Sequence, residues 1–159
     1  MRRLTMWVRA GGVVAGTAVA GCLAPNLSIP PDLVIRCETD EICPRGRRCS
    51  QRFDRCVDAS DETPPGVVAA SAPESVGLSG VVRVLLEVDE LLGEHPEVWL
   101  DVGGSPSFFT LDRADFPVFE YVWEHTGDIP PGSVGMVRTL LVDWAENEST
   151  IALRTLSVR

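Results

Sequence analysis

Cysteine is the residue type with the clearest chemistry in this 159-residue chain, and there are five of them. Cys22 stands alone, while four others lie within 20 residues, separated by five, five and six residues: Cys37, Cys43, Cys49 and Cys56. Four thiols at such positions could bind zinc or pair as disulfides. Structural zinc favours ligand pairs a few residues apart, often with histidine, and this segment offers neither. We therefore expect two disulfides, for which four cysteines allow three pairings.

The first residues of the chain have the order of an export signal. Met1–Arg9 is cationic, Ala10–Ala20 is uncharged and rich in Ala, Gly and Val, and Gly21 precedes Cys22. A transmembrane helix needs about 20 apolar residues, which is roughly twice the length of this segment. The pattern predicts a signal peptide over residues 1–21 and therefore an exported mature chain, in which disulfides persist.

The sequence Val19-Ala20-Gly21-Cys22 resembles the bacterial lipobox. The resemblance implies that Cys22 receives a diacylglyceryl thioether and an acylated amino terminus, and each buried methylene of such an anchor contributes about 0.8 kcal/mol. An ordinary secreted protein with a chance cysteine is the alternative. Because Leu23 is not the aspartate associated with inner-membrane retention, the outer membrane is favoured. Residues 22–36, which contain three prolines, are expected to form an extended tether.

Residues 37–57 are expected to form a disulfide-rich module. Their pattern of cysteine, aspartate, cysteine-proline, glycine and two further cysteines resembles small repeats of the Dickkopf and EB type, found beside the lipobox in bacterial surface lipoproteins. The resemblance implies the pairs Cys37–Cys49 and Cys43–Cys56. Such a segment has few apolar side chains, so covalent links must replace burial. The apolar candidates for its core are Ile42, Phe53 and Val57.

Charge is distributed unevenly along the chain. The formal net charge is −9, all cations are arginines, and residues 57–159 hold five arginines against eighteen carboxylates. A chain this acidic lacks the basic face that nucleic-acid binding requires, so nucleic acid is excluded as a partner. The module, by contrast, contains Arg45, Arg47 and Arg48. These arginines could contact an anionic glycan or the acidic neighbouring domain, or could simply keep the module soluble.

The rest of the chain reads as short strands. In Val81–Glu90, apolar residues alternate with charged ones, which indicates a half-buried strand. A linker is expected over residues 58–77, with an edge strand at Val67–Ala70, and a bulge is expected near Arg154. The further strand candidates are 97–102, Phe108–Leu111, 119–124, Val134–Asp143 and Thr150–Val158. Strands at this spacing predict an all-β antiparallel β-sandwich over residues 78–159.

The last third of the chain resembles a known family. Pro130-Pro131-Gly132, an apolar strand and then Asp143–Asn147 resemble the bacterial immunoglobulin-like repeats that end in an Asp-x-Ala-Gly-Asn turn. The match covers most of residues 78–158, with Glu146 in place of the usual glycine. The resemblance implies an immunoglobulin-like sandwich with a structural or adhesive role.

Two features of this domain suggest binding. Trp99 lies between Val98 and Leu100, so on a strand its side chain points to the face opposite theirs. There it either covers a second packed surface or is exposed to a partner. Asp143, Asn147 and Glu148 could bind calcium, although turn-forming side chains explain them equally well.

No motif predicts catalysis. His95 and His125 lack a serine or cysteine motif beside them, solvent-exposed positions suffice for both, and the carboxylates show no reason to converge. We therefore expect no enzyme, cofactor or resident metal. The first hypothesis is a lipid-anchored envelope protein that binds an envelope or extracellular protein or glycan through its sandwich, with the module as a rigid spacer. The second is a receptor or inhibitor that binds through the arginine-rich module, and a hydrolase would require paired carboxylates in a cleft.

Overall fold

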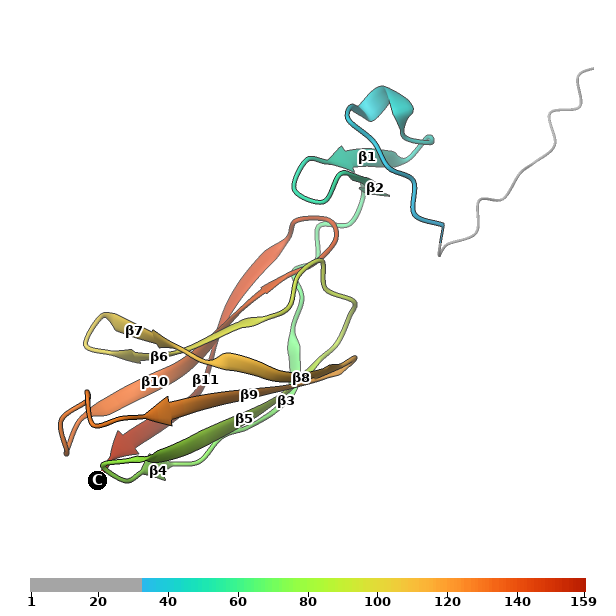
Figure 1. Ribbon diagram of the computed structural model, residues 1–159. Coiled ribbons are helices and arrows are strands. Elements are labelled where there is room, and N and C mark those ends of the chain that lie inside the picture. Colours follow the sequence, from blue (N-terminus) through green and yellow to red (C-terminus); the bar gives the residue numbers. More distant parts are fainter. Residues whose placement is uncertain (1–32) are drawn as a thin grey trace, which may run out of the picture. The chain divides into compact units, whose positions relative to one another are not determined.

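The computed structural model describes residues 33–159. The expected signal peptide, Cys22 and the tether as far as residue 32 lie outside these residues. Val34–Arg159 form one compact unit, which consists of β-strands and a 3₁₀ turn, η1 (Asp40–Ile42), as Figure 1 shows. Among the described residues, no helix has the length and apolar character needed to cross a membrane. The prediction of an all-β chain is confirmed for this part.

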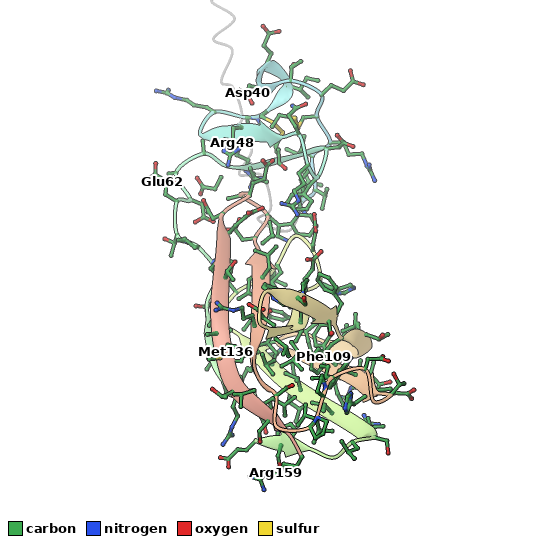
Figure 2. The ribbon with its side chains drawn as sticks, turned by 90° about the vertical axis from the view of Figure 1, so that its left-hand side faces the viewer. Asp40, Arg48, Glu62, Phe109, Met136 and Arg159 are labelled. Carbon is green, nitrogen blue, oxygen red and sulfur yellow. A yellow bond between two sulfur atoms is a disulfide. The ribbon has the colours of Figure 1, made fainter. Side chains whose placement is uncertain are left out.

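The cysteine module (residues 37–57) is built on a small hairpin. Strands β1 (Arg47–Ser50) and β2 (Arg55–Asp58) pair antiparallel, with Cys49 opposite Cys56. Disulfides join Cys37 to Cys49 and Cys43 to Cys56, and their sulfurs are drawn yellow in Figure 2. The predicted disulfides are therefore confirmed, in the pairing that the resemblance implies. Because disulfide sulfurs are not free thiolates, a zinc site does not fit this arrangement.

The core of the module consists of its cystines. Cys37, Cys49 and Cys56 are at most 6% exposed, with Ile35 and Cys43 packed against them. Of the predicted apolar core, Val57 is buried, but Ile42 is 54% exposed. The ring of Phe53 instead contacts the neighbouring domain. The expectation for Ile42 and Phe53 was therefore wrong, because the two disulfides fill the small interior without them.

Two larger sheets form the rest of the unit, which we call the two-sheet domain (residues 67–158). The four-stranded sheet has the order β3-β5-β9-β8. Its strands are β3 (Val67–Ser71), β5 (Gly80–Val88), β9 (Val118–His125) and β8 (Thr110–Asp115). The five-stranded sheet has the order β4-β11-β10-β6-β7. Its strands are β4 (Ser75–Val76), β11 (Glu148–Val158), β10 (Val134–Val142), β6 (Glu97–Val102) and β7 (Ser105–Phe108). Only the β4–β11 pair among these is parallel.

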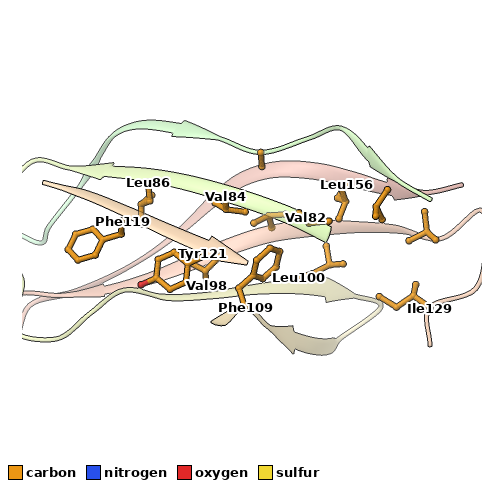
Figure 3. Close-up of a cluster of buried hydrophobic side chains, with 14 of the residues drawn as sticks. Val82, Val84, Leu86, Val98, Leu100, Phe109, Phe119, Tyr121, Ile129 and Leu156 are labelled. Atoms are coloured by element: carbon orange, nitrogen blue, oxygen red, sulfur yellow. The ribbon is translucent and has the colours of Figure 1, made fainter. Parts of the chain in front are cut away.

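A single hydrophobic core receives side chains from both sheets. Val82, Val84 and Leu86 on β5 are completely buried, as the period-two pattern of this segment predicts. Val98 and Leu100 on β6 contribute from the other sheet. Figure 3 shows these side chains between the strands. Alternation along each strand therefore places one face of each sheet in a shared interior.

The chain changes sheets at Phe109. Phe108 ends β7 in the five-stranded sheet, and Thr110 begins β8 in the four-stranded sheet. Between them, the Phe109 amide donates to the carbonyl of Val98, and its side chain is only 7% exposed. The prediction of one strand at Phe108–Leu111 was wrong, because this short apolar stretch is the crossover between two strands.

Two other expectations about strands hold. In the β10–β11 ladder, Val137 pairs with Arg154 and Arg138 pairs with Ala152, so the predicted bulge beside Arg154 is confirmed. β3 is an edge strand at the predicted place. The second half of the expected linker, however, supplies β3 and β4 to the sheets.

Candidate functional site

The cysteine module is docked on the two-sheet domain through a set of contacts that we call the junction. The module contributes Arg48, Ser50, Arg52, Phe53 and Arg55, and the domain contributes Gly93, Glu94, Trp144, Ala145, Glu146 and Glu148.

Aromatic packing lies at the centre of the junction. The rings of Phe53 and Trp144 meet edge to face with centroids 5.0 Å apart. The guanidinium carbon of Arg55 lies 3.9 Å from the centroid of the Trp144 ring, a cation–π contact. A Cβ atom on Gly93 would lie 2.4 Å from Cζ of Phe53, so only glycine leaves room for this ring. The close fit fixes the module against the loop that precedes β6.

Ion pairs surround this aromatic contact. Nε of Arg52 lies 2.5 Å from Oε1 of Glu94, and Nη1 lies 2.7 Å from Oε1 of Glu148. These hydrogen bonds raise the pKa of Arg52. Since the three side chains are between 36% and 53% exposed, each pair contributes at most about 1 kcal/mol. Their chief effect is to set the orientation of the module.

The predicted arginine cluster does not form one binding surface. Nη2 of Arg48 donates to the carbonyl oxygen of Ala145 in the two-sheet domain. Arg47 is half-buried on β1 opposite Asp58, and Arg45 is exposed. Contact with the neighbouring domain, one of the three roles expected for these arginines, is therefore the role that Arg48 has in this structure.

Glu146 of the two-sheet domain contacts the module at the junction. Its backbone has φ = 66°, a left-handed conformation that favours glycine. Its carboxylate accepts a hydrogen bond from the hydroxyl of Ser50, which lowers the pKa of Glu146, and lies 3.5 Å from the amide nitrogen of Arg52. Glu146 therefore keeps a left-handed turn, which glycine would adopt without strain, and adds a contact with the module. The sequence contains no signal that Glu146 contacts Ser50.

Trp99 lies in a row of residues across the outer face of the five-stranded sheet. Its cross-strand partners are Phe108 on β7 and Arg138 on β10, and Arg138 also pairs with Ala152 on β11. Residues directly opposite one another on neighbouring strands share a face. We call Phe108, Trp99, Arg138 and Ala152 the aromatic row.

Exposure shows that the aromatic row faces away from the core. The neighbours of Trp99 along β6, Val98 and Leu100, are at most 1% exposed, so Trp99 points to the opposite side. Trp99 is half-buried beside Phe108, with ring centroids 6.3 Å apart, and Phe108 is 60% exposed. Trp99 therefore lies outside the core, partly covered by its neighbours on the outer face and partly exposed.

Charged groups flank the aromatic row. Nε of Arg138 lies 3.7 Å from Oδ2 of Asp101, and both side chains are partly exposed. Met136, labelled in Figure 2, is the cross-strand partner of Asp101, next to the pair formed by Arg138 and Trp99 on the same face. An apolar strip with an adjacent ion pair can offer both stacking and hydrogen-bonding groups to a ligand.

Three carboxylates converge where the segment before β3 meets the two-sheet domain. Oxygens of Asp61, Glu90 and Asp143 all lie within 4.8 Å of one another. Burial, with the nearby carboxylates of Asp143, Asp61 and Asp89, raises the pKa of Glu90. This convergence has no signal in the sequence, because Asp61 comes from a segment whose path the sequence does not reveal.

Of the three predicted calcium ligands, Asp143 and Asn147 are brought together and Glu148 is not. Asp143 is 1% exposed, and its Oδ1 and Oδ2 accept hydrogen bonds from the backbone and side-chain amides of Asn147, each at 2.8 Å. The carboxylate of Glu148 pairs instead with Arg52. Asp143 and Asn147 instead stabilise the turn between β10 and β11, which is the other role expected for them.

The two histidines differ. His95 is exposed, as expected, and lies edge-on to Phe119 with centroids 6.0 Å apart. His125 is only 3% exposed and stacks on Trp123 at 5.2 Å, so the expectation of an exposed position was wrong. Its position at the inward-facing end of β9 explains its burial.

The chain was compared with known proteins. No protein-family model matches it, and no curated protein matches it.

Proposed function

We propose that this chain is a lipid-anchored protein of the cell envelope whose immunoglobulin-like domain has a non-catalytic role in adhesion or envelope structure. The lipobox-like segment before Cys22 supports attachment to a membrane, with the outer membrane favoured by Leu23. The two disulfides of the module fit a protein outside the cytoplasm.

Strand order supports the immunoglobulin-like part of the proposal. In immunoglobulin domains, strands A, B, E and D form one sheet and strands C, F and G form the other, with C′ added in variable-type domains. The four-stranded sheet here has the order β3-β5-β9-β8, which corresponds to A, B, E and D by position in the chain. In the other sheet, β11-β10-β6-β7 corresponds to G, F, C and C′.

The observation that carries the binding role is the contrast between two surfaces. Arg48 and Arg52 of the module are engaged with the two-sheet domain, whereas Trp99 and Phe108 form an aromatic surface on its outer face. Partly exposed aromatic side chains are typical anchors of binding sites. The aromatic row is thus the proposed contact surface for an envelope or extracellular partner, and the module is a rigid spacer between it and the membrane.

Mass spectrometry of the mature protein tests the anchor. We expect a polypeptide that begins at Cys22, carries acyl chains and contains two disulfides. The Cys22→Ala variant should lose the acyl mass and remain unprocessed. A mature chain that begins elsewhere or carries no acyl group would refute the anchored part of the proposal.

Substitutions in the full chain test the contact surface. Trp99→Ala with Phe108→Ser should abolish cross-linking of the protein to its partners on intact envelopes, while Arg45→Ala with Arg47→Ala should leave it unchanged. The opposite result would favour the module as the binding site, as the receptor or inhibitor hypothesis requires. Circular dichroism of both variants controls for folding.

A further inference from the structure

A groove opens beside β9 at the point where the chain passes from one sheet to the other. The ladder between β8 and β9 ends at the pair of Thr110 and Val122, because the residue before Thr110, Phe109, is the crossover. β9 continues beyond Val122 as far as His125, and there it pairs only with β5. The space beside this extension is a groove of about 520 Å³. Binding sites for small ligands have volumes of this order.

Two aromatic residues, Phe108 and Trp123, line the groove. Phe108 is 60% exposed, and Trp123 is half-buried. The ring of Trp123 lies 5.8 Å from that of Phe109 and stacks on His125 at 5.2 Å, measured between centroids. These contacts hold the ring in place before any ligand binds. Because the face of an aromatic ring carries partial negative charge, it attracts a cation.

The charged groups at the groove are mostly carboxylates. Asp112 and Glu124 line it together with Arg83. Nη1 of Arg83 lies 3.0 Å from Oδ2 of Asp112 and 2.7 Å from Oε1 of Glu120, so this cation is shared by two carboxylates. Glu124 is exposed and has no ion pair within residues 33–159. One arginine among three carboxylates leaves a site that repels anions and attracts cations.

The junction uses the same kinds of group to hold an arginine. There the guanidinium carbon of Arg55 lies 3.9 Å from the centroid of the Trp144 ring, and Arg52 pairs with two glutamates. The groove also combines a tryptophan with carboxylates, but Arg83 makes no cation–π contact in the part of the chain that the structure describes. A guanidinium fits both kinds of group, because it is planar, stacks on aromatic faces and pairs with carboxylates.

We propose that this groove binds the guanidinium of an arginine presented by a partner protein, against the aromatic pair and the carboxylates of Asp112 and Glu124. Residues 57–159 hold eighteen carboxylates and five arginines, which attract a basic partner to this domain. Because it names a class of partner, the inference rests on the proposed binding role. It uses a different surface, however, which shares only Phe108 with the aromatic row.

Titration of the full chain in detergent with the peptide acetyl-Gly-Arg-Gly-amide, followed by NMR, tests the proposal. The indole N–H resonance of Trp123, assigned with Trp123→Phe, should shift to saturation. The dissociation constant should be on the order of 1 mM, as exposed cation–π and ion-pair contacts allow. The same peptide with citrulline, the uncharged analogue of arginine, should cause no shift. An unshifted Trp123 with the arginine peptide, or equal binding of the citrulline peptide, would overturn the proposal.

A charge-matched pair of double variants tests the carboxylates. Asp112→Asn with Glu124→Gln should weaken binding of the arginine peptide about fivefold. Glu41→Gln with Glu62→Gln removes the same charge at exposed positions outside the groove and should bind as the wild type does. Equal weakening in both would show that overall charge attracts the peptide, against the proposal. Tighter binding of free arginine than of the peptide would exclude a partner protein as the source of the guanidinium.

Trp99→Ala separates this inference from the proposed function. Trp99 does not line the groove, so its loss should weaken cross-linking on intact envelopes and leave peptide binding unchanged. If the wild type fails to bind the peptide while cross-linking still requires Trp99, only the groove proposal is wrong. If the peptide binds while Trp99→Ala cross-links normally, the groove proposal holds and the role of the aromatic row is wrong.

Discussion

The carboxylate of Glu146 accepts a hydrogen bond from the hydroxyl of Ser50, although the two residues belong to different domains. Ser50 is completely buried, and its Oγ also accepts the amide of Phe53 at 3.1 Å. The contact therefore connects the β10–β11 turn with the residue that inserts its ring beside Gly93. A left-handed backbone costs a residue other than glycine about 1–2 kcal/mol, which the junction contacts of Glu146 offset.

We expect Glu146→Gly to separate the stability of the domain from that of the junction. Glycine adopts φ = 66° without strain, so the β10–β11 turn should be at least as stable as in the wild type. The lost carboxylate should loosen the module, and the amides of β1 and β2 should exchange hydrogen faster. Glu146→Ala, which keeps the strain and removes the carboxylate, should loosen both elements. Unchanged exchange in the module would contradict the role of Glu146.

Phe53→Ala should destabilise the unit more than Arg52→Ala. Removing a half-buried aromatic ring from its contact with Trp144 should lower the free energy of unfolding by about 2 kcal/mol. The two partly exposed ion pairs of Arg52 should together contribute about 1 kcal/mol, because such pairs typically give about 0.2–1 kcal/mol each, and about 1 M salt should remove most of that. Urea unfolding at low and high salt measures both effects. A larger loss for Arg52→Ala would show that charge, and not aromatic packing, dominates the junction.

Glu90 and Glu146 should give opposite dependences of stability on pH. Burial raises the pKa of Glu90 in the folded state, so its favourable contribution is complete below the unfolded value of 4.5 and is lost as pH rises through the raised pKa. The hydrogen bond from Ser50 lowers the pKa of Glu146, so its contribution is present above 4.5 and is lost as pH falls through the lowered pKa.

Thermal unfolding from pH 3 to pH 8 distinguishes the two groups. Relative to the wild type, Glu90→Gln should stabilise the protein at neutral pH, and Glu146→Gln should flatten the decline in acid. Glu62→Gln, which alters an exposed carboxylate, should follow the wild-type profile. If Glu90→Gln destabilises the protein at neutral pH, the three carboxylates do not repel one another as their spacing implies.

Thr139→Val should stabilise the two-sheet domain. Thr139 is completely buried, and its hydroxyl has no hydrogen-bond partner among the described residues. Valine has nearly the same shape and removes the unsatisfied group, so the free energy of unfolding should rise by about 1 kcal/mol. Thr155→Val, at an exposed position on β11, is the control and should change stability little. A loss of stability in Thr139→Val would reveal a partner for the hydroxyl.

The sequence by itself determined the features that depend on local pattern. Alternation along Val81–Glu90 is enough to identify β5, because successive side chains of a strand point to opposite faces. Gly103 and Gly104, with φ of 61° and 88°, form the turn between β6 and β7, because glycine tolerates this conformation. The number and spacing of the clustered cysteines likewise predicted two disulfides.

Tertiary structure decided the features that depend on long-range contacts. Phe109 lies between a strand of one sheet and a strand of the other, a change of sheet that no local period reveals. Phe53 packs beside Gly93, and Asp61 meets Asp143, across segments that no local period relates. Periodicity reports which side of an element faces inward, but which elements meet depends on packing of the whole chain. The junction, the carboxylate cluster and the aromatic row were therefore set by the folded structure.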